Sequence, residues 1–272
     1  MGSYLWNSLQ IKKRKDMKKK ANFIWYEFFK YFLIALQFLT IIPLRTKKNS
    51  KIEDVDIANS TLFFPLVGLV IGGFLLLIYL FFSRYFSYEI TSVFVLGGWV
   101  YLTGALHIDG LIDTIDGLSG GRDKKEILNI MKDTHIGAKG CIGVFFLMLI
   151  KFFLIIQIIS SLKLRALIYV PVISRWGMLT GCYVTDYARE EGMGKFSLFL
   201  GYPQIIGASL IAVILGILLM GLSFLTLLIA IGVFSLVWSF YLKRKIGGFT
   251  GDTLGALNEI GEVIVLLIVS LG

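Results

Sequence analysis

Three aspartates lie within eight residues, directly after an apolar run of near membrane-spanning length: Asp109, Asp113 and Asp116. If this stretch is helical, each residue turns by about 100°, so Asp113 lies roughly 40° from Asp109 and Asp116 roughly 20° to its other side. The three carboxylates then share one face. Because like charges repel strongly when buried, a divalent cation with oxygen ligands is the simplest way to hold them ionised. We therefore expect a Mg²⁺ site here.

Further polar clusters follow along the chain, and they carry groups suited to phosphate chemistry. Two glycines before Arg122 let the backbone approach an anion that arginine can grip with two hydrogen bonds. Asp252 lies among glycines, and it shares a face with Glu259 if that stretch is helical. The predicted site comprises the metal ligands Asp109, Asp113, Asp116 and Asp252, the catalytic residues Asp116, Asp133, Arg122, Lys132 and Arg175, and the cofactor-binding residues Gly121, Arg189 and Gly251.

Several of these polar residues also have a purely structural interpretation. Asp133 and Asp252 are suitable helix caps. Arg175 lies inside an apolar run, where pairing with a membrane carboxylate or a lipid headgroup would offset the cost of its charge. His107 falls on the helix side opposite the aspartates, so we expect a structural hydrogen bond rather than metal ligation. Lys151, also within an apolar run, is expected to extend its amine to the membrane surface.

The elements that must position these residues are membrane helices. Only 17% of the residues are charged and 56% are hydrophobic, with a mean hydropathy of +0.78, whereas soluble domains have about a quarter charged residues. We predict an all-α, polytopic membrane helix bundle with about seven spans. Residues 1–22 form a basic cytoplasmic tail and residues 23–272 a single membrane-embedded catalytic domain. The apolar runs are 23–44, 62–82, 90–106, 140–160, 166–184, 202–220, 221–240 and 260–271.

Basic residues sort the polar connections by side. Four alternate connections, 44–60, 107–139, 185–201 and 241–258, are rich in lysine and arginine, which predicts that all four face the cytoplasm. Run 23–44 has basic residues on both flanks, so we expect it to lie along the interface or to re-enter rather than cross. The net charge of +9 comes largely from basic residues beside this run, which favours contact with anionic lipid and argues against nucleic-acid binding.

Carboxylates that bind Mg²⁺, with arginines and lysines beside them, suit phosphate-ester chemistry. The chain has no Walker A sequence, and no Ser–His or Cys–His pairing indicates acyl transfer. At these residues the chain resembles cobalamin synthase, the adenosylcobinamide-GDP ribazoletransferase family of vitamin B12 assembly. His135 stands where the family usually has arginine, and Lys139 where it has an apolar residue. The matching residues are 36–40, 42–43, 64–68, 103–118, 121–123, 130–133, 136–137, 140, 174–176, 187–189, 192–194 and 248–256.

The resemblance implies an Mg²⁺-dependent transferase of phosphorus-containing groups in the cytoplasmic (inner) membrane, with its site facing the cytoplasm. It would join adenosylcobinamide-GDP to α-ribazole or α-ribazole 5′-phosphate, giving adenosylcobalamin or its 5′-phosphate and GMP. A ribose hydroxyl would attack the phosphorus next to the cobinamide arm, and Asp116 or Asp133 would take its proton. The expected partners are these two substrates and the lipid bilayer, with no nucleic acid and with a homo-oligomer left open.

Three other classes also place spaced carboxylates in membranes. A CDP-alcohol phosphotransferase begins its motif with Asp-Gly-x-x-Ala-Arg, whereas Asp113-Thr114 occupies the Ala-Arg positions here. An intramembrane prenyltransferase would use Asp109 and Asp113 to bind a diphosphate. A cation transporter would hold its carboxylates near mid-membrane on broken helices, whereas the predicted topology puts these at the cytoplasmic edge.

Overall fold

The computed structural model describes residues 25–43, 52–161 and 163–271, and the regular structure in these ranges is helical. The basic tail over residues 1–22 and residues 44–51 of the first basic connection lie outside the described residues. After a helix over residues 25–39, the helices are α2 (Asp54–Ser60), η1 (Thr61–Phe63), α3 (Phe64–Phe82), α4 (Tyr88–Thr103), α5 (Leu106–Gly120), α6 (Lys124–Ile130), α7 (Ala138–Ser160), α8 (Arg165–Val184), η2 (Met193–Phe199), α9 (Tyr202–Met220), η3 (Gly221–Ser223), α10 (Phe224–Ile246) and α11 (Gly251–Leu271).

The helices form the predicted polytopic bundle. By length and apolar composition, five helical segments of the described chain can cross a membrane, or six if the bent pair α4 and α5 counts as one span. One of the five covers 45 residues and contains both α9 and α10. Both helices pack against the 20-residue α8, so the chain turns back between them at η3. The predicted number of about seven spans stays a prediction.

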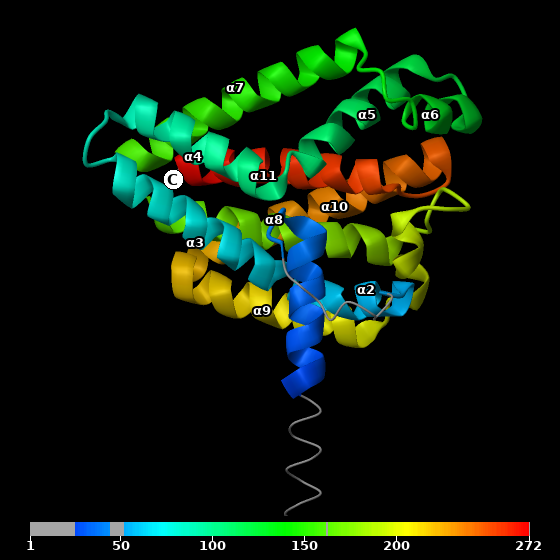
Figure 1. The fold of residues 1–272 in the computed structure, drawn as a ribbon, viewed down its shortest axis with the longest axis horizontal. Helices are drawn as coiled ribbons and strands as arrows, with labels where there is room; N and C mark the ends of the chain where they lie inside the picture. The colour runs from blue at the N-terminus through cyan, green and yellow to red at the C-terminus, as the bar shows by residue number, and fades with distance from the viewer. Residues whose placement is uncertain (1–24, 44–51, 162, 272) are drawn as a thin grey trace, which may run out of the picture.

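Helix α8 is the centre of the bundle, with α3, α9, α10 and α11 packed around it (Figure 1). A Cβ on Gly68 of α3 would lie only 2.4 Å from the carbonyl oxygen of Pro171. Glycine is therefore required where α3 and α8 touch. Small residues at helix contacts are the usual way to bring membrane helices together, because lipid supplies no hydrophobic drive between them.

Helices α4 and α5 form a broken pair bent by 85°. The two residues at the break, Gly104 and Ala105, both adopt the left-handed conformation, with φ of 62° and 56°. That conformation costs an L-residue such as Ala105 about 1–2 kcal/mol. The bend turns α5 away from the direction of α4. The segment that the sequence predicted as the 107–139 connection therefore begins with a helix, α5, and also contains α6.

The described parts of the polar connections gather at one end of the bundle, as their charges predicted, and backbone hydrogen bonds of Phe249 with Asp186 and Ala188 join two of them. Helix α2 packs on η2, and α6 packs on α10. The side of the membrane that this end faces stays a prediction. In Figure 1 the helix over residues 25–39 stands across the direction of α8 and α9 instead of alongside them, which is the orientation expected of a helix that lies along the interface.

Candidate active site

Helices α5 and α11 meet at two glycines. A Cβ on Gly110 would lie 2.8 Å from the backbone oxygen of Asp252, and a Cβ on Gly255 would lie 3.1 Å from the Cα of His107. The two backbones can approach this closely only because side chains are absent at both positions. This contact places the aspartates of α5 beside the first turn of α11, where Asp252 lies.

Asp109, Asp113 and Asp252 form an acidic group at this crossing. Asp113 is close enough to interact electrostatically with Asp109 and Asp252, and Asp252 interacts in the same way with Asp109. Asp109 is exposed and Asp113 is half-buried. Neither carboxylate has a hydrogen bond or ion pair with another described residue. The helical register that predicted a shared face for Asp109 and Asp113 therefore leaves both available to a ligand.

Arg189 supplies the positive charge of the site. Its Nη2 donates to Oδ2 of Asp252 at 2.7 Å, while its Nε is buried and has no hydrogen-bond partner in the described part of the chain. The loop that carries Arg189 is held by two backbone hydrogen bonds. Ala188 donates its N–H to the carbonyl of Phe249 at 2.8 Å, and Phe249 donates to the carbonyl of Asp186 at 3.0 Å. The buried Nε leaves one guanidinium donor available for an anion.

Asp116 has a different environment from the other two aspartates of α5. Its Oδ2 accepts the N–H of Gly137 and its Oδ1 accepts the N–H of Gly140, both at 2.8 Å. These are among the N–H groups that a helix leaves unpaired at its start. Asp116 therefore joins the beginning of α7 to α5.

Asp133 lies outside the α5–α11 crossing, on the exposed connection between α6 and α7. Its Oδ1 accepts the backbone N–H of His135 at 3.0 Å and lies 2.6 Å from Nδ1 of the same residue. The hydrogen bond from His135 lowers the pKa of Asp133, and the same contact raises the pKa of His135. Asp133 thus forms a local turn with the residue that departs from the family pattern.

The remaining predicted residues surround this end of the bundle. Arg122 and Lys132 are exposed. A Cβ on Gly121 would lie 2.5 Å from the backbone nitrogen of Ile127, so that glycine permits the contact between α5 and α6. A Cβ on Gly251 would meet nothing within 4 Å, which leaves open space at the start of α11. These features are compatible with an anionic ligand at the rim.

Within the described ranges, no three carboxylate, imidazole or thiol groups are arranged as a ready-made metal site. Mg²⁺ does not require one, because it usually keeps several waters and binds through one or two carboxylates together with substrate phosphates. Asp109 and Asp113 offer unpaired carboxylate oxygens, and Asp252 adds a third group that Arg189 now neutralises. These oxygen donors fit a hard cation whose coordination shell is completed by phosphate oxygens and water.

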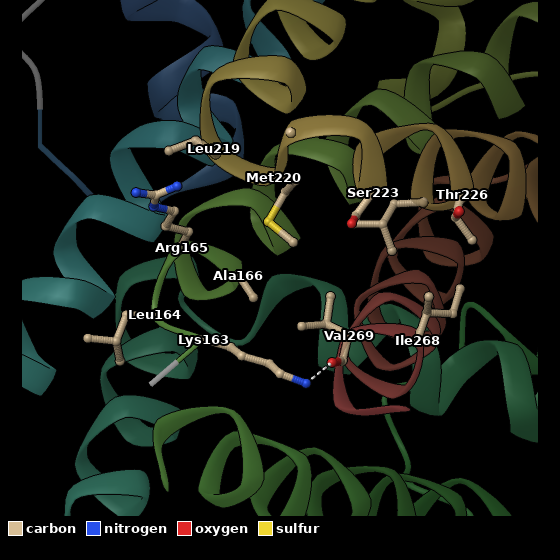
Figure 2. A pocket seen from close by; sticks show the side chains of 12 residues that line it. Lys163, Leu164, Arg165, Ala166, Leu219, Met220, Ser223, Thr226, Ile268 and Val269 are labelled. Carbon is tan, nitrogen blue, oxygen red and sulfur yellow. Dashed lines mark hydrogen bonds between the residues drawn. The ribbon is translucent and has the colours of Figure 1, made fainter. Parts of the chain in front are cut away.

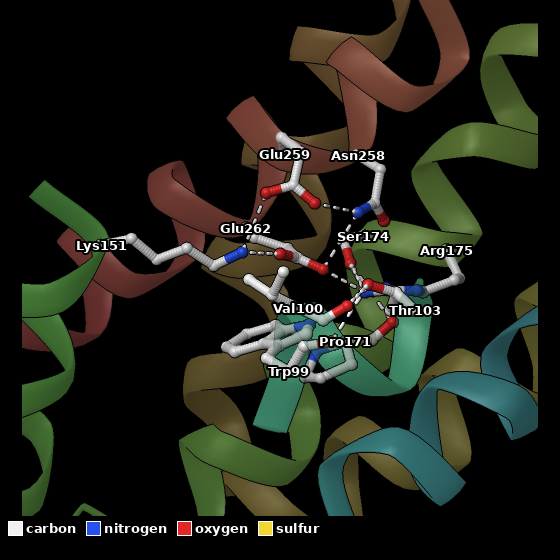
Figure 3. Close-up of polar contacts among 10 residues, drawn as sticks. All are labelled: Trp99, Val100, Thr103, Lys151, Pro171, Ser174, Arg175, Asn258, Glu259 and Glu262. Carbon is white, nitrogen blue, oxygen red and sulfur yellow. Dashed lines mark hydrogen bonds and ion pairs between the residues drawn. The ribbon is translucent and has the colours of Figure 1, made fainter. Parts of the chain in front are cut away.

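Arg175 does not lie with these carboxylates but in a buried ion cluster of α7, α8 and α11 (Figure 3). Arg175 and Lys151 both pair with Glu262, and Lys151 also donates to Glu259 at 3.0 Å. Lys151 Nζ lies 4.1 Å from the ring centre of Trp99 on α4. The alternative that Arg175 pairs with a membrane carboxylate is therefore confirmed.

Two expectations about single residues were wrong. Lys151 does not extend to the membrane surface, because its amine finds two carboxylates in the core and its side chain is only 2% exposed. His107 is buried, but neither ring nitrogen has a hydrogen-bond partner among the residues that the structure describes. The one sequence signal for this cluster was the presence of Lys151, Glu259 and Glu262 in or beside apolar runs, where unpaired charge is costly.

The fold and the site define a multi-pass helical membrane protein that gathers carboxylates and an arginine at one end of its bundle. A family model described as cobalamin-5-phosphate synthase matches residues 31–270. The chain belongs to this family and is a transferase of cobalamin biosynthesis.

Curated relatives cover nearly the whole chain. An adenosylcobinamide-GDP ribazoletransferase from Caldanaerobacter subterraneus subsp. tengcongensis is 37% identical over 246 residues, which is 89% of this chain and 98% of the relative. A relative of the same name from Thermoanaerobacter sp. (strain X514) is 34% identical over 241 residues, which is 88% of this chain and 96% of the relative. No solved structure matches the chain.

Proposed function

We propose that this chain transfers the adenosylcobinamide-phosphate moiety of adenosylcobinamide-GDP onto α-ribazole or α-ribazole 5′-phosphate. The products are adenosylcobalamin or its 5′-phosphate, and GMP. The observation that carries the proposal is the α5–α11 contact, which brings Asp109 and Asp113 to Asp252 and Arg189. The names of the relatives support the same substrates.

In the proposed reaction, the ribose hydroxyl oxygen bonds to the phosphorus attached to the cobinamide arm. The phosphoanhydride bond to GMP breaks, GMP leaves with that bond's electron pair, and the hydroxyl proton passes to a base. We propose that Asp109, Asp113 and Asp252 hold Mg²⁺, which when bound neutralises charge on the pyrophosphate. Arg189 would orient a phosphate through its unpaired Nε–H.

The choice of proton acceptor between Asp116 and Asp133 stays a prediction. Asp116 accepts two backbone N–H groups, and His135 lowers the pKa of Asp133. The lowered pKa of Asp133 weakens this carboxylate as a base. Arg122 and Lys132, both exposed at this end, would offset phosphate charge at the rim.

The test uses the purified protein in liposomes with adenosylcobinamide-GDP and α-ribazole, and GMP release is measured with and without Mg²⁺. Asp113→Asn should lower turnover at least about a hundredfold, the scale of losing one electrostatic group of an active site. The matched control is Glu89→Gln, which removes an exposed carboxylate from the first turn of α4. Near-normal turnover by Asp113→Asn would refute the proposed role of this carboxylate.

We also propose that the site faces the cytoplasm, since the basic connections gather at its end of the bundle. Lys132→Cys, on the exposed connection after α6, provides a test. A membrane-impermeant maleimide should label this cysteine in inside-out vesicles and leave it unlabelled in intact cells. Labelling in intact cells would reverse the assigned orientation.

A further inference from the structure

A cavity of about 950 Å³ lies at the end of the bundle opposite the carboxylates. Helix α11 begins at Gly251 beside the candidate active site, whereas Ile268 and Val269 near its other end line the cavity. Seventeen residues of helix separate Gly251 from Ile268, which corresponds to about 25 Å. The cavity is therefore distinct from the candidate active site.

The wall of this cavity combines apolar side chains with two cations. Lys163 and Arg165 lie at one side, and the hydroxyl groups of Ser223 and Thr226 lie at the other (Figure 2). No carboxylate of the described chain lines the cavity. The remaining lining residues are Leu164, Ala166, Leu219, Met220, Gly221, Leu227, Ile268 and Val269.

Both cations keep hydrogen-bond donors for a ligand. Lys163 Nζ donates to the carbonyl oxygen of Val269 at 3.0 Å (Figure 2), which uses one of its three donors. The side chain of Arg165, the first residue of α8, is exposed and has no hydrogen bond or ion pair with another described residue. The two side chains contribute a local charge of +2, and no carboxylate of the described chain lines the cavity beside them.

The helices beside this cavity expose apolar surface that lipid chains would cover in a membrane. The segment Tyr202–Ile246 contains α9 and α10, and only 17% of its most apolar window is buried inside the protein. The cavity includes the turn between these helices, at Met220 and Gly221. A ligand with an anionic head and apolar tails would match both the cations and the lining.

We propose that this cavity binds one anionic phospholipid of the surrounding leaflet. Its phosphate lies against Lys163 and Arg165, and its acyl chains extend along α9 and α10. Basic pockets between membrane helices favour anionic headgroups, because each lysine or arginine adds attraction for the negative phosphate. The choice of a bilayer lipid over a free phosphate follows from the apolar side chains that form most of the lining.

Native mass spectrometry of the full chain, released from mixed micelles, tests this proposal. Phosphatidylglycerol should remain bound at one copy per chain, phosphatidylcholine should not, and inorganic phosphate should not displace the retained lipid. Arg165→Gln should weaken retention about fivefold, and its combination with Lys163→Gln about thirtyfold. Lys163→Arg should retain the lipid, since the positive charge is kept.

The control is Arg84→Gln, which removes an exposed cation from the turn between α3 and α4. Helix α3 passes Ile168 of α8 at Gly72 and Val172 at Gly68, so this turn lies at the same end of the bundle as Arg165. Arg84→Gln should leave lipid retention unchanged. The proposal would be overturned if Arg84→Gln lost as much bound lipid as Arg165→Gln, or if phosphatidylcholine were retained as well as phosphatidylglycerol. Displacement of the bound lipid by inorganic phosphate would also overturn it.

Discussion

Removal of Lys151 tests whether the buried ion cluster holds the helices of this bundle together. Lys151 and Arg175 contribute two positive charges, and Glu259 and Glu262 contribute two negative charges, so the cluster is neutral. Lys151→Met leaves a net charge of −1. Glu262 keeps its pairing with Arg175, but Glu259 loses its ion-pair partner among the described residues.

The expected loss of stability is large, because the cluster is almost completely shielded from solvent. Removing one partner of a buried ion pair costs about 3–5 kcal/mol, a large part of the roughly 5–15 kcal/mol that stabilises a typical protein. At about 2–4 °C per kcal/mol for a chain of this size class, Lys151→Met should lower the unfolding temperature by roughly 6–20 °C.

The assay heats the protein, fused to a fluorescent protein, and measures by fluorescence how much of the folded gel-filtration peak remains at each temperature. The double variant Lys151→Met with Glu259→Gln restores neutrality, so it should recover much of the lost stability. Lys125→Met on α6 removes an exposed lysine and should change the unfolding temperature little. The reasoning fails if Lys151→Met unfolds like the unsubstituted protein, or if the double variant is less stable than the single one.

Two further predictions concern the packing of the site and the connection beside it. Gly110→Ala places a methyl group 2.8 Å from the backbone oxygen of Asp252. The overpacking should lower the free energy of unfolding by about 1–3 kcal/mol and should also lower GMP release. In the control Gly73→Ala the methyl group meets nothing within 4 Å, so stability and GMP release should not change. Asp133→Asn should lower the pKa of His135, because Asp133 raises that pKa. NMR titration of the His135 ring measures the change. The Asp133–His135 attraction is lost as pH rises through the raised pKa of His135, and as pH falls through the lowered pKa of Asp133.

The sequence predicted the helical class and the register of the acidic residues on α5. Both depend on local patterns: apolar runs of span length predict membrane helices, and a four-residue spacing puts Asp109 and Asp113 on one face. The gathering of the polar connections at one end was also predicted, because it follows from the alternation of basic residues along the chain.

Contacts between distant helices were beyond this reasoning. Lys151 lies 108 and 111 residues from its partners Glu259 and Glu262, and spacing within one helix carries no information about such pairs. The separate environment of Asp116 was missed for the same reason. Its position on α5 matches the other aspartates, but the N–H groups of Gly137 and Gly140 lie more than twenty residues away.

Helix α11 connects the stability of the bundle to the chemistry of the site. Asp252 lies in its first turn and pairs with Arg189 at the candidate site, whereas Glu259 is seven residues deeper, about 10 Å along the axis, and paired in the core. Because lipid provides no hydrophobic drive between helices, the ion cluster and the glycine contacts must set the axial position of α11. A shift of α11 at Glu259 would therefore also move Asp252 relative to Gly110 and to the aspartates of α5.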